Sequence, residues 1–134
     1  MQSMFNGCTK LKYLDLTYFN TSNVTDMSYL FYKCHKLKEI KGINIFNTAK
    51  VEYMDKMFNE CYELENLDLS NFNTSNVTDM TWMFDSCNKL KYLNVSNFII
   101  NGETKKMFFS FNKKECKFIA NANDKKLIQL YNSS

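Results

Sequence analysis

A segment of 26 or 27 residues recurs along this chain, and the recurrence constrains the fold more than any other feature. Its clearest copies are LKYLDLTYFNTSNVTDMSYLFYKC at Leu11–Cys34 and LENLDLSNFNTSNVTDMTWMFDSC at Leu64–Cys87. The copies place a cysteine at intervals of 26, 27 and 26 residues, at Cys8, Cys34, Cys61 and Cys87. Self-similarity at a period of roughly 20–50 residues is typical of proteins that stack one small unit on the next. We therefore expect successive copies to lie one on top of another.

A single copy is too small to be stable alone. It buries about six apolar side chains, worth roughly 1.5–3 kcal/mol each. Ordering its backbone costs roughly 1–2 kcal/mol per residue, and this cost exceeds the gain from burial. Stability must therefore come from neighbouring copies that cover one another's flanks.

The first half of each copy predicts a short strand with one buried face. Leu67-Asp68-Leu69 alternates apolar and polar residues, as a half-buried strand does, and the matching segments are Leu14–Leu16 and Leu93–Val95. The second copy differs, because Ile40–Ile45 contains Gly42 and one extra residue. A glycine in a strand with one residue too many predicts a β-bulge.

The second half of each copy predicts a helix of about two to three turns. Apolar residues recur there every three or four positions, at Val77, Met80, Met83, Phe84 and Cys87. Thr78 or Asp79 is the expected N-cap, and Thr25 or Asp26 is its equivalent in the first copy. The Asn-Thr-Ser-Asn segments at 20–23 and 73–76 predict turns, because short polar side chains bond their own backbone.

These copies resemble the leucine-rich repeat of BspA-like bacterial surface proteins, which also occurs in mycoplasma lipoproteins. The motif M-F-x-x-C-x-x-L-x-x-L-D-L-S-x-F-N-T-S-N-V-T-D-M carries the resemblance over residues 4–98. The resemblance implies an α/β fold: a right-handed leucine-rich-repeat solenoid with one short parallel strand and one short helix per 26-residue repeat. It also implies display at a cell surface, binding of other proteins and no enzymatic activity. The Gly42 segment and the C-terminal tail depart from the motif.

We divide the chain into leucine-rich repeats over residues 1–98 and a C-terminal capping segment over residues 99–134. Within the cap, Cys116–Ala120 predicts a strand. Asn123 or Asp124 predicts the start of a final helix that carries Leu127, Ile128 and Leu130. Met107-Phe108 echoes the Met-Phe pair of the repeats.

Every basic residue is lysine, and the net charge of +3 is unevenly distributed. Residues 99–134 carry seven lysines and three acids, whereas residues 1–98 carry ten lysines and eleven acids. The absence of arginine argues against a nucleic-acid reader, because such proteins usually rely on the bidentate guanidinium group. We interpret the lysine-rich tail as a solvated surface.

Neither the cysteines nor the single histidine predicts a reactive site. The chain has no C-x-x-C pair to indicate zinc, and stacked side chains point in the same direction rather than toward each other, which disfavours disulfides. We expect the thiols of the repeats to be free and buried and to stack in one row, or file, along the repeats. Cys116 lies outside this file. His35 follows Cys34 at a predicted helix end and is interpreted as a surface residue, not as part of a cysteine–histidine pair or a Ser-His-Asp triad. No catalytic residue, metal or cofactor is predicted.

We predict that the outward strand positions form the binding surface, because solenoids commonly bind partners along such faces. Those positions are Tyr13, Asp15, Thr17, Glu39, Lys41, Asn66, Asp68, Ser70, Tyr92, Asn94 and Ser96. The alternative interpretation is a plain solvated sheet face. On the helix side Tyr29, Lys56 and Trp82 are equivalent, and Tyr29 and Trp82 are candidate contacts.

The predicted function is non-enzymatic protein binding by a solenoid fragment of a surface-displayed adhesion or interaction protein. The alternative is structural self-association, in which the apolar edge of the first repeat pairs with a second chain as a homodimer. That edge contains Met4, Phe5, Leu11 and Leu14. Nucleic acid is not an expected partner, and no membrane span is expected.

No stretch approaches the roughly 18 apolar residues of a membrane span, and MQSMFNGCTK lacks the regions of a secretion signal. The chain also begins inside a repeat, without the polar cap usual in solenoids. We therefore expect a piece of a longer protein, located at the cell surface or secreted. A complete chain would be intracellular.

Overall fold

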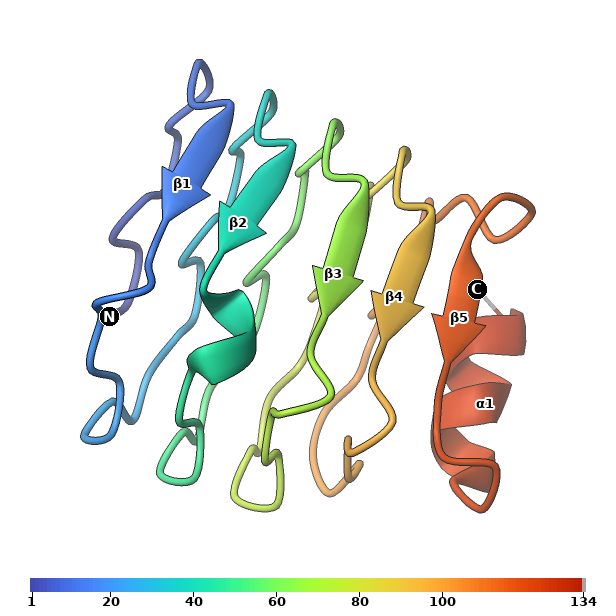
Figure 1. The fold of residues 1–134 in the computed structure, drawn as a ribbon. Coiled ribbons are helices and arrows are strands. Elements are labelled where there is room, and N and C mark those ends of the chain that lie inside the picture. Colours follow the sequence, from blue (N-terminus) through green and yellow to red (C-terminus); the bar gives the residue numbers. More distant parts are fainter. Residues whose placement is uncertain (134) are drawn as a thin grey trace.

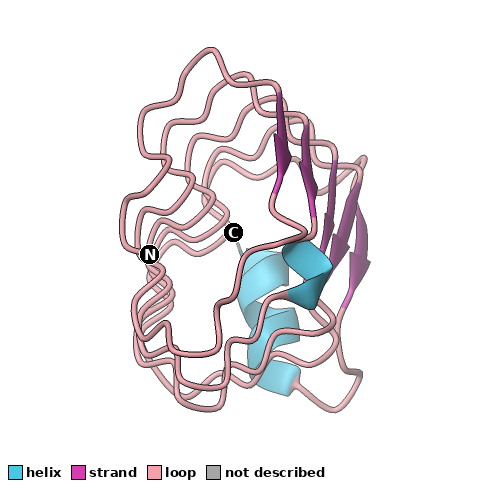
Figure 2. Ribbon diagram, turned by 60° about the vertical axis from the view of Figure 1, so that its left-hand side comes forward, coloured by secondary structure: helices cyan, strands magenta, loops and turns pink. Residues whose placement is uncertain are grey.

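In the computed structural model, which describes residues 1–133, the repeats lie side by side as successive turns of the chain (Figures 1 and 2). Short strands line one side of the turns, and loops form the other sides (Figure 2). The elements follow the order β1 (Tyr13–Asp15), β2 (Glu39–Lys41), a 3-10 helix η1 (Ile43–Ile45), β3 (Asn66–Asp68), β4 (Tyr92–Asn94), β5 (Lys117–Ile119) and α1 (Lys125–Ser133).

The strands pair in parallel, in the register that the repeat dictates. Leu14 in β1 is opposite Ile40 in β2, and Leu67, Leu93 and Phe118 are aligned across β3, β4 and β5. On another side of the turns, parallel bridges link four residues in series, Asp26, Tyr53, Asp79 and Glu103. The predicted short parallel strands are confirmed, each beginning one residue earlier than the alternation indicated. The fold combines small, open parallel sheets with one α-helix.

The prediction of one short helix per repeat is wrong. Within residues 1–133 the only α-helix is α1, and the predicted helical segments are runs of tight turns. Tyr29 and Lys33 each have a φ of 58°, and the equivalent positions in the other repeats also have positive φ values: Ser3, Gly7, Lys56, Glu60, Trp82, Ser86, Lys106 and Ser110. An α-helix needs negative φ at every residue, so a left-handed residue at every fourth position excludes it.

Alternate amides in these turns donate to the next repeat instead of to the residue four positions earlier. The N–H groups of Tyr29 and Phe31 bond the carbonyls of Asp55 and Met57 at 3.0 and 2.9 Å. The amides between them close four-residue turns, as the Leu30 N–H does with the Met27 carbonyl at 3.3 Å. The apolar residues still face inward at helix-like spacing, because each turn spans about as many residues as a helical turn. Because the spacing is similar, the sequence pattern predicted a helix where the structure has turns.

The predicted β-bulge at Gly42 is also wrong. The extra residue lies after β2, where η1 lets Ile43 occupy the buried place that Leu16 and Leu69 occupy in other copies. Gly42 has a φ of 83°, and a Cβ there would lie 2.7 Å from the Thr17 backbone nitrogen, so only glycine fits. Beside this insertion β2 and β3 do not pair, and the strands form separate sheets of two and three.

Files of identical side chains fill the interior. Five phenylalanines stack with neighbouring centroids 5.4–5.9 Å apart: Phe5, Phe31, Phe58, Phe84 and Phe108. A second file contains Phe46, Phe72 and Phe98, at 6.4 and 6.5 Å. Offset stacking at these distances adds about 0.5–1.5 kcal/mol per pair beyond burial. Phe108 extends the first file, as its Met-Phe motif predicted.

The predicted buried free thiols are confirmed at Cys34, Cys61 and Cys87. Each Sγ donates a hydrogen bond at 3.1–3.2 Å to a backbone carbonyl of the preceding repeat. Burial raises the pKa of Cys34 to about 12, and it raises the pKa of the other two thiols further. These thiols therefore stay protonated and act as small apolar groups with one donor. Cys8, at the open end of the file, is exposed.

The end of the chain covers the last repeat, beside β5 (Figure 1). The Asp124 carboxylate accepts the Leu127 N–H at 2.9 Å, so the predicted cap of the final helix is confirmed for Asp124. Leu127 is fully buried, and the Tyr131 ring stacks on Phe118 with centroids 3.8 Å apart.

Buried threonines join neighbouring turns through reciprocal hydrogen bonds. The Thr74 hydroxyl donates to the Ile99 carbonyl at 3.0 Å and accepts the Ile99 N–H at 2.7 Å. Thr21 bonds Asn47 in the same way, and Thr48 bonds Asn73. One hydroxyl therefore satisfies both backbone groups of a residue in the next repeat.

Replacing Thr74 by valine should destabilise the protein by about 2–4 kcal/mol, because it leaves a buried N–H and a buried C=O without partners. Thr74→Ser keeps the hydroxyl and should cost less, roughly 1 kcal/mol, for the lost methyl group. Urea unfolding of both variants measures the difference. A valine variant as stable as the serine variant would contradict this role.

Candidate interaction surface

The predicted strand-face residues lie together on the strand side of the turns, and all of them are exposed or half-buried. The strand pairing sets Tyr13 beside Glu39 and Asp15 beside Lys41. It also sets Asn66 beside Tyr92 and Asp68 beside Asn94, while Thr17, Ser70 and Ser96 follow the strand ends. Of the two tyrosines predicted for this face, Tyr13 is the more exposed, with 63% of its surface exposed, whereas Tyr92 is half-buried.

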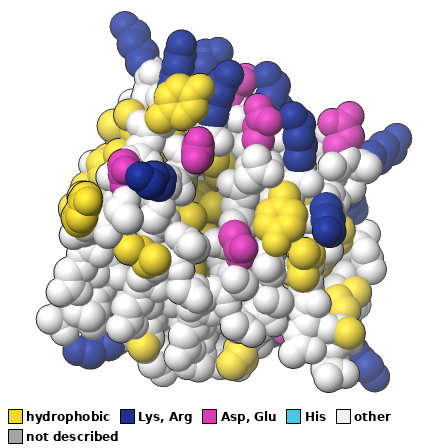
Figure 3. All heavy atoms as spheres, viewed as in Figure 1, with side chains coloured by type: hydrophobic (Ala, Val, Ile, Leu, Met, Phe, Trp, Pro, Cys, Tyr) yellow, Lys and Arg dark blue, Asp and Glu magenta, His cyan; other side chains and the backbone are white. Residues whose placement is uncertain are grey.

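The strand face is hollowed where β2 and β3 fail to pair. Space-filling atoms show this hollow on the face that carries the strands (Figure 3). It has a volume of about 360 Å³ and is lined by Tyr13, Lys38, Glu39, Glu65 and Asn66. A shallower hollow of about 270 Å³ continues over β1 and β2 and again includes Tyr13 and Glu39. Three of the predicted contacts, Tyr13, Glu39 and Asn66, therefore line one depression.

The polar residues at the strand ends are largely engaged within the chain. Asp15 accepts hydrogen bonds from the Thr17 hydroxyl and N–H and from the Lys41 ammonium group, and these contacts lower the pKa of Asp15 to about 2. Asp68 and Asn94 accept the equivalent N–H bonds from Ser70 and Ser96 at 3.0 and 3.1 Å.

The side chains that line the hollow are less engaged. Among the described residues, no hydrogen bond or ion pair occupies the side chains of Tyr13, Glu39 or Asn66. Their polar groups are therefore available to a partner.

On the opposite side of the turns, aromatic residues alternate with lysines at the equivalent left-handed positions. The Lys56 ammonium lies 5.1 Å from the Tyr29 ring centroid, and the Lys106 ammonium lies 4.5 Å from that of Trp82. Trp82 is half-buried and also meets the Phe109 ring edge-to-face at 5.8 Å. Tyr29 and Trp82 therefore both make cation–π contacts with lysines of the same chain, and Trp82 also contacts another ring.

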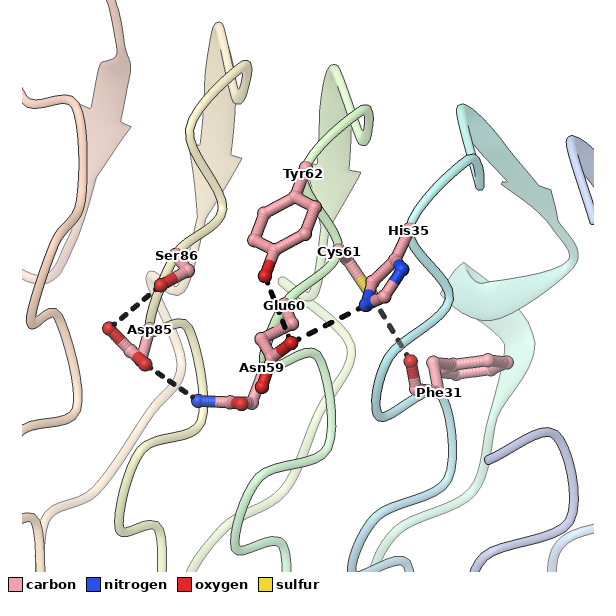
Figure 4. Close-up of polar contacts among 8 residues, drawn as sticks. All are labelled: Phe31, His35, Asn59, Glu60, Cys61, Tyr62, Asp85 and Ser86. Atoms are coloured by element: carbon pink, nitrogen blue, oxygen red, sulfur yellow. Dashed lines mark hydrogen bonds and ion pairs between the residues drawn. The ribbon is translucent and has the colours of Figure 1, made fainter. Parts of the chain in front are cut away.

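His35 is half-buried in a polar cluster between repeats (Figure 4). Its ring stacks on Tyr62 at 4.9 Å, and its Nε2 lies 3.4 Å from the Glu60 carboxylate, which also accepts the Tyr62 hydroxyl at 2.9 Å. The predicted position of His35 at a helix end is wrong, because no helix forms there. The Cys34 thiol donates its hydrogen bond to the Phe5 carbonyl and not to His35.

Asp85 is a buried acid that the sequence interpretation missed. It occupies the position of Asn59 one repeat later, and the two side chains bond at 2.9 Å (Figure 4). Ser86 donates a second hydrogen bond at 3.2 Å. Burial raises the pKa of Asp85, and the nearby Glu60 carboxylate adds to the effect. The repeat alignment places Asp85 in register with Asn59, and only the packed turns show that this position is buried.

Replacing Asp85 by asparagine should raise stability near neutral pH. A folded-state pKa above the unfolded value of about 3.9 means that the folded protein binds the proton more tightly, so wild-type stability falls as pH rises through this window. The gain from Asp85→Asn should be largest above the window and small below it. Urea midpoints across pH measure it, with Asp55→Asn as a control of equal charge change. A gain of the same size at every pH would contradict the assignment.

No group of three or more His, Cys, Asp or Glu side chains within residues 1–133 is arranged to hold a metal ion. None of the described helices is both long and apolar enough to cross a membrane.

The sequence profile of a family described as "Mycoplasma protein of unknown function, DUF285" matches residues 1–123. The chain belongs to this family. The DUF285 match spans all the repeats and β5 and ends before α1. No curated protein and no solved structure is significantly similar to the chain.

Proposed function

We propose that this DUF285 chain is a protein-binding module without enzymatic activity: a right-handed leucine-rich-repeat solenoid of the BspA-like kind. We further propose that it belongs to a longer adhesion or interaction protein, secreted or displayed at a cell surface. The single observation that carries the binding role is the hollow at the break between β2 and β3. It combines an exposed aromatic ring with polar groups that have no partner within residues 1–133.

The composition of the hollow suits a polypeptide partner. Tyr13 offers a large contact area at a low entropic cost, and Glu39 and Asn66 can bond a backbone or a basic side chain. The hollow is open and shallow, which fits side chains of a docked segment better than an enclosed small molecule. The rows of polar groups on either side would form the rim of the interface.

A random peptide library displayed on phage tests this role, with the whole chain immobilised as the target. Enriched peptides should bind the Tyr13→Ala/Glu39→Ala variant at least roughly tenfold more weakly, as expected for the loss of a central aromatic contact. The matched control is Thr25→Ala/Glu52→Ala, which alters a different hollow of about 500 Å³. Failure to enrich any peptide, or equal loss in both variants, would contradict the proposal.

The open end of the first repeat favours a second candidate function, self-association. Met4 is 51% exposed and Phe19 is 39% exposed, whereas their counterparts Leu30 and Phe46 are 0% and 2% exposed. Light scattering of the same samples separates the candidates, because a strict monomer that binds the selected peptides would exclude a dimer as the functional unit.

A further inference from the structure

Ion pairs on the strand side of the turns follow one pattern, in which an acid pairs with the lysine at the equivalent position of the next repeat. The pairs are Asp15 with Lys41 at 3.0 Å, Glu63 with Lys89 at 2.9 Å and Glu65 with Lys91 at 2.8 Å. Glu39 departs from this pattern, because the neighbouring repeats have Tyr13 and Asn66 at its position. Its exposed carboxylate therefore has no cationic partner in the part of the chain that the structure describes.

Glu39 borders the hollow that forms where β2 and β3 do not pair. The gap begins where the chain enters the strands, because the Glu65 nitrogen lies 3.5 Å from the Lys38 carbonyl oxygen. The equivalent N–H groups of Lys38 and Lys91 bond the preceding repeat at 2.8 Å. The hollow thus lies between two repeats inside the stack, and it is a product of the irregular register there.

The charges in the lining of the hollow are not balanced. The lining contains two glutamates and one lysine, namely Glu39, Glu65 and Lys38. Lys91 pairs with Glu65 and lowers its pKa, and the charge of Lys38 adds to that effect. Both lysines therefore act on Glu65, whereas no lysine within residues 1–133 forms an ion pair with Glu39. The carboxylate of Glu39 is the charge that a partner can match.

A guanidinium group suits the three side chains of the hollow that have no partner within the described chain. It can form two parallel hydrogen bonds with one carboxylate, and its flat face packs on an aromatic ring. Glu39 supplies the carboxylate, Tyr13 supplies a ring that is 63% exposed, and the amide oxygen of Asn66 accepts a further N–H.

The chain uses the same chemistry elsewhere with lysine. The Lys33 ammonium lies 5.0 Å from the ring centroid of Tyr32, and the Lys56 ammonium lies 5.1 Å from that of Tyr29. The sequence contains no arginine. A second copy of this chain therefore has no guanidinium group to offer, so the group must come from a different polypeptide.

We propose that the partner presents an arginine side chain to this hollow, with its guanidinium group paired with Glu39, stacked on Tyr13 and bonded to Asn66 Oδ1. This inference rests on the proposed binding function and names the group that the hollow recognises. A lysine of the partner gains less, because its compact ammonium group can neither pair through two parallel bonds nor stack as a plane. An acidic segment is excluded by the like charge of Glu39.

Two peptide libraries displayed on phage test the proposal, with the whole chain immobilised as the target. They differ only in a fixed central residue, which is arginine in one and glutamate in the other. The arginine library should yield binders and the glutamate library should not. Replacing the fixed arginine of a selected peptide by citrulline keeps its shape and removes its charge. Fluorescence anisotropy should show that this change weakens binding at least roughly tenfold.

Variants of the chain assign the effect to Glu39. Glu39→Lys should reverse the preference between the two libraries, and Glu39→Gln should weaken the arginine peptides about as much as citrulline does. The matched control is Glu52→Lys, an equal charge change at the separate hollow of about 500 Å³, which should leave the preference unchanged. Glu39 is exposed, so these variants should fold, and equal urea midpoints confirm it.

The arginine assignment and the proposed function fail in different ways. Equal enrichment from both libraries, tight binding of the citrulline peptide or a preference that Glu39→Lys leaves unchanged would overturn the arginine assignment alone. So would peptides without arginine that come from the fully random library and lose affinity in Tyr13→Ala/Glu39→Ala. Failure of all three libraries to yield a binder would contradict both the arginine assignment and the proposed function.

Discussion

The structure depends on hydrogen bonds that each repeat donates to the next one. In an isolated turn, the alternate amides of residues 27–33 would have no acceptor, and left-handed residues such as Tyr29 and Lys33 would carry an uncompensated backbone cost. A neighbouring repeat supplies the carbonyl acceptors, so these amides are hydrogen-bonded in the stacked structure. Cooperation between neighbours therefore determines the local conformation of each repeat as well as its stability.

A constant offset between neighbours explains why identical residues form files. Because the register changes little from turn to turn, a phenylalanine meets a phenylalanine, a thiol meets the same carbonyl, and a threonine meets the same peptide group. The one extra residue at Gly42 is absorbed by η1, and the sheet pairing is interrupted beside it. The hollow lined by Tyr13, Glu39 and Asn66 thus arises where the repeat is least regular. At the C-terminal end, α1 covers the last repeat.

Much of this arrangement followed from the sequence, because the repeat period and the strand alternation are set by burial. The strands, the buried thiols and the Asp124 cap were predictable for that reason. The turns were not, because Tyr29, Lys56 and Trp82 are residues that ordinarily avoid positive φ, and only contacts between repeats hold them there. The strand-face residues could be named from alternation. The hollow among them could not, because it depends on a pairing that fails between β2 and β3. Asp85 was missed because only the packed turns reveal that its position is buried.

Scalar couplings across hydrogen bonds, measured by NMR on the isotope-labelled chain, test the central claim most directly. The account predicts a coupling from the Phe58 amide nitrogen to the Met83 carbonyl carbon, because that N–H bonds the next repeat at 3.0 Å. The corresponding couplings should join Phe31 to Met57 and Phe84 to Met107. A coupling from Phe58 to Met54, four residues earlier, would mean that the segment is helical and would contradict the account.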